Sequence, residues 1–407
     1  MTLVSITRLS AGGDGVGRLP DGMVVFVPRT APGDEAEIEI VERRKRHAHG
    51  RLLRLARPGP ARVEPECPHY TADRCGGCQL QHLTLPAQRE AKAAIVGDAL
   101  RRIGRREIPN PELVPSPTPW RYRAKITLAV ARERIGLHRY DAPGMVFALD
   151  DCRITREPLT RLWSAVREHR ALLPPTLEDV VLREDRGGGL HVVVGGGGEP
   201  WDAAPLAAAA GAEGVAYWWR PQGGAARVVA GARTGFPALA FEQVNRELGA
   251  RIRQDAVGEL GDVSGKVVWD LYGGVGDAAR LLAAGGARLF SVDRDRAAIE
   301  WARGQAGSGE GIAWFEGLVE ESLHRLPEPD AVLVNPPRTG LVARVSAALQ
   351  AWGESRPGAR LCYVSCDPAT LARDLARLPG FTLARVRAYD LFPHTSHVET
   401  LAVLQAG

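Results

Sequence analysis

From about residue 237 to the end, the chain alternates short apolar runs with stretches of helical periodicity. The runs read KVVWDLY, ARLFSVD, GIAWFEG, DAVLVNPP, ARLCYVSC, TLARVRAYDLF and TLAVLQ. Helical stretches separate the first five, and FPHTSHVE joins the last two. Strands that alternate with helices form a parallel sheet covered on both faces. We therefore predict an α/β fold with a doubly wound sheet over residues 237–407, ending in an antiparallel pair of strands.

The fifth run ends in a cysteine that is followed at once by a helix start. In LCYVSCDPATLAR, Asp367 suits an N-cap and Pro368 suits the first helical position. Cys366 therefore falls at the carboxyl end of a strand, where open α/β sheets bind ligands. A helix N-terminus favours a thiolate, so we expect Cys366 to be a better nucleophile than a free thiol. Cys362, inside the strand, is predicted to be a buried structural cysteine.

Other polar groups are expected at the same edge of the sheet. Asp270-Leu-Tyr-Gly-Gly-Val-Gly276 is a glycine turn that lets a ligand approach the backbone. The next strand ends about twenty residues later in Asp293, which is suited to ribose hydroxyls. These two features fit either a dinucleotide or S-adenosylmethionine. The fourth strand ends in Asn335-Pro-Pro-Arg338, a turn that is typical of nucleic-acid methyltransferases and favours S-adenosylmethionine.

The first 236 residues are predicted to form two further domains. Residues 1–62 read as a small β-barrel, with strand-like runs MVVFVP, EAEIEIVER and GRLLRLA between glycine-rich turns. Such barrels often bind RNA or DNA. Basic residues crowd the end of this domain, from Arg43 to Arg62. That run indicates either a polyanion contact or a solvated face.

Residues 63–236 are predicted to form a central antiparallel α+β domain. A helix is expected over residues 83–104, with Ile95, Ala99 and Ile103 on one side, followed by a proline-rich linker, PNPELVPSPTPW. WRYRAKITLAVARERIGLHRY reads as a hairpin, and LHVVVGGGG and VAYWWR read as further strands. The low-complexity segment 203–214 is predicted to be a surface excursion.

Four of the six cysteines lie outside the C-terminal domain. Cys67, Cys75 and Cys78 fall within twelve residues, and Cys152 is the fourth. Disulfides are rare in cytosolic proteins. Three clustered thiols and one distant thiol therefore indicate a tetrahedral metal centre or an iron–sulfur cluster, which the spacing alone does not distinguish.

The composition is that of an ordinary water-soluble protein. The chain has 407 residues, of which 45% are hydrophobic and 25% are charged, with a formal net charge of +4. No apolar run is long enough to span a membrane, and the N-terminus lacks a signal-peptide core. We expect a monomer in the cytoplasm, with no membrane partner.

The motifs and their order resemble the RNA 5-methyluridine methyltransferases, especially those of bacterial 23S ribosomal RNA. The first 60 residues resemble the TRAM domain of that family. The segments that resemble family motifs are CPHYTADRCGGCQLQH, WRYRAK, DDCRIT, FEQVN, DLYGGVG, NPPRTG, YVSCDPATLARDL and HTSHVETLAVL. The resemblance implies a class I, Rossmann-like S-adenosylmethionine methyltransferase domain that follows the barrel and the central domain.

The resemblance also implies roles for individual residues. Cys366 is the expected nucleophile and Glu399 the expected general base. The positions that match cofactor contacts are Gln243, Tyr272, Gly273, Gly274, Gly276, Asp293 and Asn335. The positions that match ligands of a [4Fe-4S] cluster are Cys67, Cys75, Cys78 and Cys152. Two departures stand out: seven residues separate Cys67 from Cys75 where the family usually has five, and Leu318 stands where a polar cofactor contact is common.

The expected reaction is methylation of carbon 5 of a uridine in RNA, in 23S ribosomal RNA, through a covalent cysteine–uracil intermediate. A transfer RNA substrate with the same mechanism is the nearest alternative. More distant alternatives are an RNA 5-methylcytosine methyltransferase, a nicotinamide-dependent oxidoreductase and a non-catalytic RNA-binding protein. His394 and His397, which precede Glu399, are expected to be surface residues of a turn.

Overall fold

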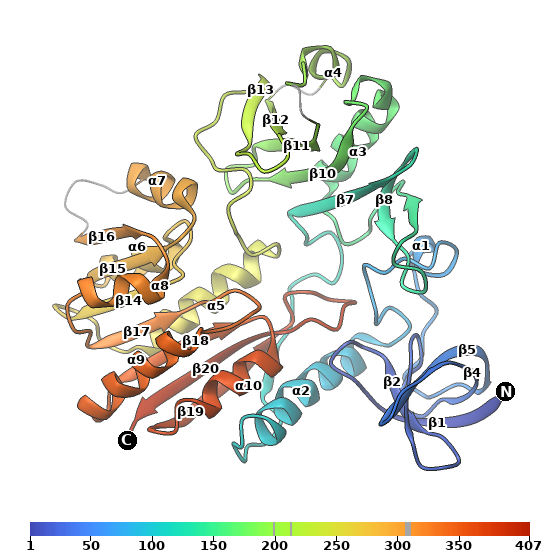
Figure 1. Ribbon diagram of the computed structural model, residues 1–407, viewed down its shortest axis with the longest axis horizontal. Helices are drawn as coiled ribbons and strands as arrows, with labels where there is room; N and C mark the ends of the chain where they lie inside the picture. The colour runs from blue at the N-terminus through green and yellow to red at the C-terminus, as the bar shows by residue number, and fades with distance from the viewer. Residues whose placement is uncertain (198–199, 212–213, 306–310) are drawn as a thin grey trace.

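The computed structural model describes residues 1–197, 200–211, 214–305 and 311–407. Its strands form a closed five-stranded barrel, a seven-stranded sheet and an eight-stranded sheet. Figure 1 shows these three units side by side, with helix α2 running between the barrel and the C-terminal sheet. In the described part of the chain, no helix combines the length and the apolar character needed to cross a membrane.

The N-terminal barrel is formed by five strands in the order β1-β2-β3-β5-β4. The strands are β1 (Thr2–Leu9), β2 (Gly15–Arg18), β3 (Val24–Val27), β4 (Glu35–Arg43) and β5 (His47–Arg57). Alternate side chains such as Val4, Ile6, Val25 and Ile38 are buried inside it. The predicted barrel is thus confirmed, although the sequence analysis did not identify β1 and β2 as strands.

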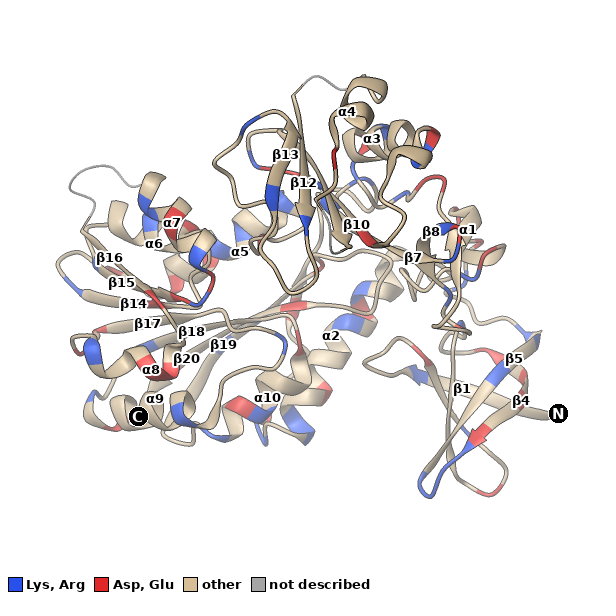
Figure 2. Cartoon of the chain, turned by 45° about the horizontal axis from the view of Figure 1, so that its top comes forward, with Lys and Arg blue, Asp and Glu red and all other residues tan. Residues whose placement is uncertain are grey.

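Most of the basic run at the end of the barrel is paired with acidic side chains. The ion pairs across β4 and β5 are Arg51–Glu39, Arg54–Glu37 and Arg57–Glu35. Arg62 pairs with the buried carboxylate of Asp34 at 2.8 Å. Figure 2 shows the resulting mixture of acidic and basic residues along these strands. This pairing leaves the tip between β4 and β5, with Lys45 and Arg46, as the candidate for a polyanion contact.

The central sheet has the order β13-β12-β11-β10-β7-β8-β9. Its strands are β7 (Lys125–Ala131), β8 (Arg134–His138), β9 (Val146–Ala148), β10 (Leu177–Glu184), β11 (Leu190–Gly196), β12 (Val215–Arg220) and β13 (Arg227–Gly231). The helical segments are α1 (Pro68–Thr71), α3 (Glu157–Glu168), η1 (Arg170–Leu172) and α4 (Ala204–Ala209). The predicted hairpin β7–β8 is confirmed. The sheet is not wholly antiparallel, because β11 and β12 run parallel.

The segment 203–214 is the connection that makes this parallel pair possible. It crosses the sheet as helix α4 and buries Ala203 and Leu206 completely in the central core. Most residues from 204 to 211 are exposed, as expected of a surface excursion, but the segment forms an alanine-rich helix whose one leucine covers the sheet. Residues 212–213 lie outside the described residues.

Helix α2 (Leu85–Arg102) joins the barrel to the C-terminal sheet. Its N-cap is Thr84, whose hydroxyl accepts from Ala87 N. Val96 and Leu100 are fully buried in the core of the C-terminal sheet, whereas Ile103 is exposed. The predicted apolar side is therefore rotated, because the helix packs on α10 (Pro368–Ala376).

The proline-rich segment after α2 is not only a linker. Residues Glu112–Val114 form strand β6, which pairs in parallel with β19 (Phe381–Tyr389) at the edge of the C-terminal sheet. The backbone groups of the two strands make the hydrogen bonds, so β6 can form without a strand-like pattern in its side chains.

The C-terminal sheet has the order β16-β15-β14-β17-β18-β20-β19-β6. Its other strands are β14 (Val267–Leu271), β15 (Arg288–Asp293), β16 (Ile312–Glu316), β17 (Ala331–Val334), β18 (Arg360–Ser365) and β20 (Glu399–Ala406). Strands β14 to β18 are parallel, and β20 is antiparallel to both β18 and β19. The predicted doubly wound sheet, with its final antiparallel pair, is confirmed.

Helices cover both faces of this sheet (Figure 1). One face packs against α2, α8 (Val319–Ser322), α9 (Ala343–Ser355) and α10. The other packs against α5 (Arg246–Glu259) and α6 (Asp277–Ala284). The remaining helical segments are α7 (Arg296–Gln305) and η2 (Leu323–Arg325). Because both faces are covered, ligands reach this sheet at its edges, and the carboxyl ends of its parallel strands are the usual place.

Candidate active site

Strand pairing brings the predicted nucleophile and the predicted base together. Strands β18 and β20 are antiparallel, and Ser365 lies opposite Thr400. The next residues beyond this pair are Cys366 and Glu399, and they lie close enough for the charge of Glu399 to raise the pKa of the Cys366 thiol. A thiol and a carboxylate therefore share one site at the carboxyl edge of the parallel strands.

The carboxyl group of Glu399 is buried at this site. Burial raises the pKa of Glu399 to about 8, and the neighbouring Gln243 amide and Arg338 guanidinium oppose that rise. Its Oε2 atom has no hydrogen-bond partner among the described residues. A carboxylate with a raised pKa and an unused oxygen is suited to accept a proton near neutral pH.

The pKa of the Cys366 thiol is raised, contrary to our expectation of a lowered one. Burial is the main cause and the charge of Glu399 adds to it, while Arg338 acts in the opposite direction. Helix α10 begins only after Asp367, whose carboxylate caps the helix by accepting from Thr370 N at 2.8 Å. The helix N-terminus is therefore already occupied by a negative charge and gives the thiol little stabilisation.

Arg338 is the residue of this site that the sequence analysis missed. It follows the Asn-Pro-Pro turn and is exposed to solvent, and its positive charge lowers the pKa of both Cys366 and Glu399. The sequence did contain a signal for this role. Arg338 follows the fourth strand of the sheet, and the end of that strand lies at the same edge as Cys366. An arginine there stabilises the deprotonated forms of both groups.

A small cavity of about 60 Å³ lies at the glycine turn after β14, and one of its lining residues, Gln243, contacts Glu399. The predicted cofactor residues that line it are Gln243, Tyr272, Gly273, Gly274 and Asn335. Asp293 lies behind the turn and accepts from Gly274 N at 2.8 Å through Oδ2. Burial raises the pKa of Asp293. The turn and the carboxylate predicted to bind one cofactor are thus in direct contact.

Glycine is required at positions 274 and 276 of this turn for different structural reasons. Gly274 has a φ of +55° and faces open space, so a ligand can approach its backbone. Gly276 has a φ of +76°, and a Cβ there would lie 2.2 Å from the ring of Trp314. Glycine at position 276 therefore allows the turn to pack against Trp314 of β16, and it does not line the cavity.

Comparisons with known proteins identify the family of the chain. Residues 2–53 match the TRAM domain model, and residues 315–406 match the tRNA (Uracil-5-)-methyltransferase model. The 23S rRNA (uracil(1939)-C(5))-methyltransferase RlmD of Alkalilimnicola ehrlichii is 31% identical to this chain, over 99% of this chain and 96% of the relative. The chain belongs to the RNA uracil-5-methyltransferase family. RlmD of Pectobacterium carotovorum subsp. carotovorum is 30% identical, over 98% of this chain and 93% of that protein.

A solved structure extends the likeness to the whole fold. The Pyrococcus abyssi tRNA (uracil-54, C5)-methyltransferase, solved with S-adenosyl-L-homocysteine, has a TM-score of 0.75 and 27% identity to this chain. The match covers 98% of this chain and 99% of the archaeal one. Family membership excludes the nicotinamide-dependent oxidoreductase, the 5-methylcytosine enzyme and the non-catalytic binding protein as readings of the whole chain. The enzyme is an RNA methyltransferase.

The four cysteines outside the methyltransferase domain gather in one region of the enzyme. Cys67, Cys78 and Cys152 share an apolar cluster with Tyr70 and Tyr122. All six cysteines of the chain are free thiols. Burial raises the pKa of Cys75 to about 11, and Cys67 and Cys152 raise it further. Within the described ranges, no three His, Cys, Asp or Glu side chains form a group that could hold a single metal ion.

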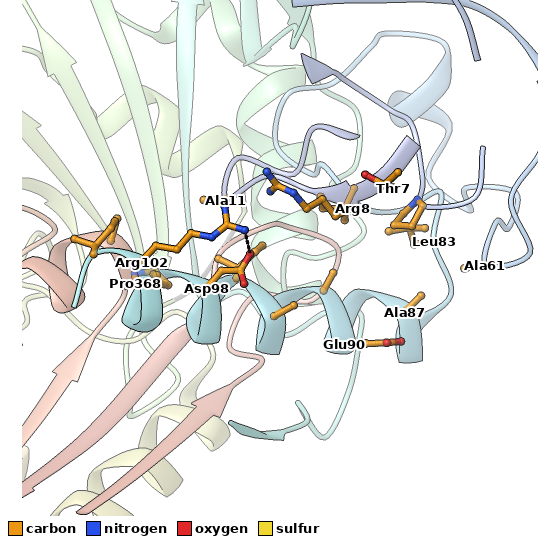
Figure 3. Close-up of a pocket in the computed structure, with 18 of the residues that line it drawn as sticks. Thr7, Arg8, Ala11, Ala61, Leu83, Ala87, Glu90, Asp98, Arg102 and Pro368 are labelled. Atoms are coloured by element: carbon orange, nitrogen blue, oxygen red, sulfur yellow. Dashed lines mark ion pairs between the residues drawn. The ribbon is translucent and has the colours of Figure 1, made fainter. Parts of the chain in front are cut away.

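A larger cavity of about 550 Å³ lies away from the predicted site residues, between β1, α2 and the first turn of α10 (Figure 3). Its lining is mainly apolar, with Arg8, Glu90, Asp98 and Arg102 among the charged groups. Asp98 and Arg102 pair with each other at 3.7 Å. Its wall reaches Pro368, two residues after Cys366.

His394 is not a surface residue of a turn, as predicted. It is buried, its ring stacks on Trp120 with centroids 3.8 Å apart, and its backbone N donates to Gln88 Oε1 at 2.9 Å. His397 is exposed, as predicted. The prediction failed for His394 because its partners come from segments more than 270 residues away in the sequence.

Proposed function

We propose that this enzyme methylates carbon 5 of a uridine in 23S ribosomal RNA through a covalent bond between Cys366 and the base. The observation that carries the proposal is that Cys366 and Glu399 follow the last pair of β18 and β20, Ser365 and Thr400, and interact electrostatically there. Similarity over nearly the full length to two 23S rRNA methyltransferases supports the ribosomal substrate. The Pyrococcus abyssi relative supports a transfer RNA substrate as the second candidate.

The reaction needs a nucleophile and a base, because carbon 5 of uracil does not accept a methyl group directly. The Cys366 thiolate adds to carbon 6, and the electron pair displaced from the C5–C6 double bond makes carbon 5 nucleophilic. S-adenosylmethionine supplies an electrophilic methyl group when bound. After methyl transfer, Glu399 takes the proton from carbon 5, the C5–C6 double bond re-forms, and the bond between carbon 6 and sulfur breaks to release the thiolate.

Residues around the small cavity are proposed to hold S-adenosylmethionine. Gly274 offers an open backbone and Asp293 a carboxylate at the same turn. Gln243, Tyr272, Gly273 and Asn335 also line the cavity, and the Gln243 side chain contacts Glu399. Gly276 supports the turn from behind. The target uridine has to leave its stack to reach Cys366, as in other enzymes that modify a base.

Activity is expected to rise as the pH increases from about 6 to about 9. The reaction uses Cys366 as a thiolate and Glu399 as a carboxylate, and the pKa values of both groups are raised, that of Glu399 to about 8. The deprotonated form of each group becomes more populated as the pH rises through its pKa. Initial rates of methyl transfer at constant ionic strength check this; a flat or falling profile over the range would contradict it.

The cysteine region is proposed to hold an iron–sulfur cluster, and Arg29 provides a structural test of that fit. This guanidinium enters the region from the barrel, lies over the ring of Tyr70 at 3.2 Å, and donates to Cys75 O at 2.5 Å. Its Nη1 atom has no hydrogen-bond partner in the described structure. Its pKa is lowered by burial to about 10, and the charged forms of Cys67, Cys75 and Cys78 act against that shift.

A half-buried cation beside Cys67, Cys75 and Cys78 fits an anionic centre. A single tetrahedral zinc ion, with bonds of about 2.3 Å, would bring the sulfur atoms within about 4 Å of one another. The described side chains do not form such a group. A cluster with bridging sulfide does not require that spacing, and the cysteine thiolates would be its ligands. The proposed contribution is to folding and RNA positioning, because methyl transfer moves no electrons.

Metal analysis tests this part of the proposal. Anaerobically purified enzyme is expected to contain about four iron and four sulfide per chain. A Cys78→Ser variant is expected to lose most of both and to melt at a lower temperature. Zinc in place of iron, or no metal in soluble active enzyme, would contradict the cluster.

Methyl-transfer assays test the reaction and its substrate. The enzyme is given labelled S-adenosylmethionine with unmodified 23S rRNA fragments and with transfer RNA transcripts, and the product nucleoside is identified. We expect 5-methyluridine in a ribosomal fragment. Product only in transfer RNA would overturn the substrate and keep the mechanism, and no 5-methyluridine in either would overturn the proposed function.

A further inference from the structure

The turn that precedes Glu399 is held by hydrogen bonds from several other parts of the chain. We call residues 390–398, between β19 and β20, the base-bearing turn. Four consecutive backbone carbonyls of this turn accept hydrogen bonds from outside the two strands that it joins. The donors are Asn245 Nδ2 to Leu391 O, Lys92 Nζ to Phe392 O, Tyr122 Oη to Pro393 O, and the amides of Gln79 and Leu80 to His394 O. The turn is therefore held by α2, by the central domain and by residues 67–81, which carry three of the cysteines and which we call the cysteine segment.

Among the contacts to the base-bearing turn, those of the cysteine segment lie nearest to Glu399 in sequence. The amides of Gln79 and Leu80, which follow Cys78, donate to His394 O at 3.0 and 2.9 Å. The Gln79 side chain then spans two segments, because its Oε1 accepts from Ser396 N at 3.3 Å and its Nε2 donates to Gly76 O at 2.8 Å. Gly76 lies between the second and third cysteines. One amide side chain thus joins the cysteine segment to the base-bearing turn.

The turn needs such support because its backbone is strained. His394 has a φ of +68°, in the left-handed region that non-glycine residues rarely adopt. Its ring stack on Trp120 and its bond to Gln88 hold this conformation. A strained residue persists only where neighbouring contacts determine its conformation. Loss of one contact is therefore expected to move the turn, and with it Glu399.

We infer that Gln79 is a positioning residue for Glu399, through which the cysteine segment sets the placement of the catalytic base. This inference rests on the proposed role of Glu399 as the base. It gives the cysteine segment a task in the reaction that needs no electron transfer: an ordered segment aims the carboxylate at the proton on carbon 5. The step affected is the one that releases the product, after the methyl group has moved.

The test compares Gln79→Ala with the conservative Gln79→Glu. Alanine removes both contacts of the side chain, whereas glutamate keeps an acceptor for Ser396 N. Gln79 is half-buried, so both variants are expected to fold. For Gln79→Ala we expect kcat to fall about tenfold, since small misplacements of a reacting group cost one to two powers of ten. The KM for RNA is expected to stay within about twofold.

The decisive readout is the share of enzyme bound covalently to RNA during turnover, measured on denaturing gels. Slow removal of the proton should leave more enzyme as the methylated adduct in Gln79→Ala, and Gln79→Glu should restore the wild-type share. Gln81→Ala is the matched control, because Gln81 accepts from Cys67 N at 3.4 Å in the same segment. Gln81 has no hydrogen bond to the base-bearing turn in the described part of the chain.

The outcomes separate the inference from the proposal beneath it. If Glu399→Gln accumulates adduct and Gln79→Ala behaves as wild type, the inference fails and the role of Glu399 stands. If Glu399→Gln itself shows no accumulation, the role of Glu399 fails. Equal loss of kcat in Gln79→Ala and Gln81→Ala, without extra adduct, would mean that both act only on the fold of the cysteine segment and would overturn the inference.

Discussion

Replacement of Cys366 by alanine is expected to abolish both methyl transfer and the covalent complex with RNA. Without a sulfur atom on carbon 6, carbon 5 of uracil lacks the electron density to take the methyl group. The loss should be at least about 10⁴-fold, as for other enzymes that lose their nucleophile. Labelled methyl transfer measures the rate, and a denaturing gel with radiolabelled RNA detects the complex.

Cys362 provides the control for this variant. It lies four residues earlier on the same strand and is completely buried in the core, away from the cavity. Cys362→Ala should lower the melting temperature slightly, through a small cavity, and should keep adduct formation. A covalent RNA complex with Cys366→Ala, of the same yield as wild type, would assign the nucleophile to another residue.

Replacement of Glu399 by glutamine is expected to trap the enzyme on its RNA. The thiolate of Cys366 still adds and the methyl group still moves, but no group removes the proton from carbon 5. The adduct should accumulate as turnover falls by about 10²–10⁴-fold, the usual contribution of a general base. The retained methyl label in the gel-shifted band checks that the block comes after transfer. Unmethylated adduct, or no adduct, would contradict the assigned step.

The same variant should be more stable than wild type at alkaline pH. The pKa of Glu399 is about 8 in the folded enzyme, above its ordinary value of 4.5. The folded state therefore binds more protons than the unfolded state between these values, and stability falls as the pH rises from about 4.5 through about 8. Glutamine carries no charge and removes this loss. The difference between the melting temperatures at pH 6 and pH 9 should be smaller in the variant than in wild type, in which Glu399 adds to the loss at high pH.

Glu247→Gln is the matched control for both measurements. Glu247 lies exposed in the first turn of α5 and makes the same change of carboxylate to amide on the surface. It should leave the amount of adduct and the pH dependence of melting as in wild type. A similar gain in alkaline stability from Glu247→Gln would mean that net charge, and not burial of Glu399, causes the effect.

Local patterns in the chain were sufficient for the parts of the fold that depend on neighbours in sequence. Apolar runs separated by helical stretches predicted β14 to β18, and the cap residues Asp367 and Pro368 marked the start of α10. Because parallel strands end at a common edge, Cys366 and Asp293 could be assigned to the same side of the sheet from sequence alone. The order of motifs predicted the family that the comparisons then identified.

The tertiary structure decided whatever depends on distant partners and on burial. Strand β6 is too short to be recognised and exists because β19 supplies its hydrogen bonds. The buried side of α2 follows from its contact with α10, and the buried state of His394 follows from Trp120 and Gln88. None of these partners is near in sequence, so periodicity carried no information about them.

The pKa values at the site also depend partly on local sequence and partly on distant residues. The local sequence shows that a thiol stands just before a helix, and this position predicted a lowered pKa for Cys366. The structure raises that pKa, because Cys366 is partly buried and because β20 brings Glu399 opposite it. Arg338 then becomes the group that favours the thiolate. The charge state of a group depends on every charge and every apolar atom around it, and only the folded chain determines which these are.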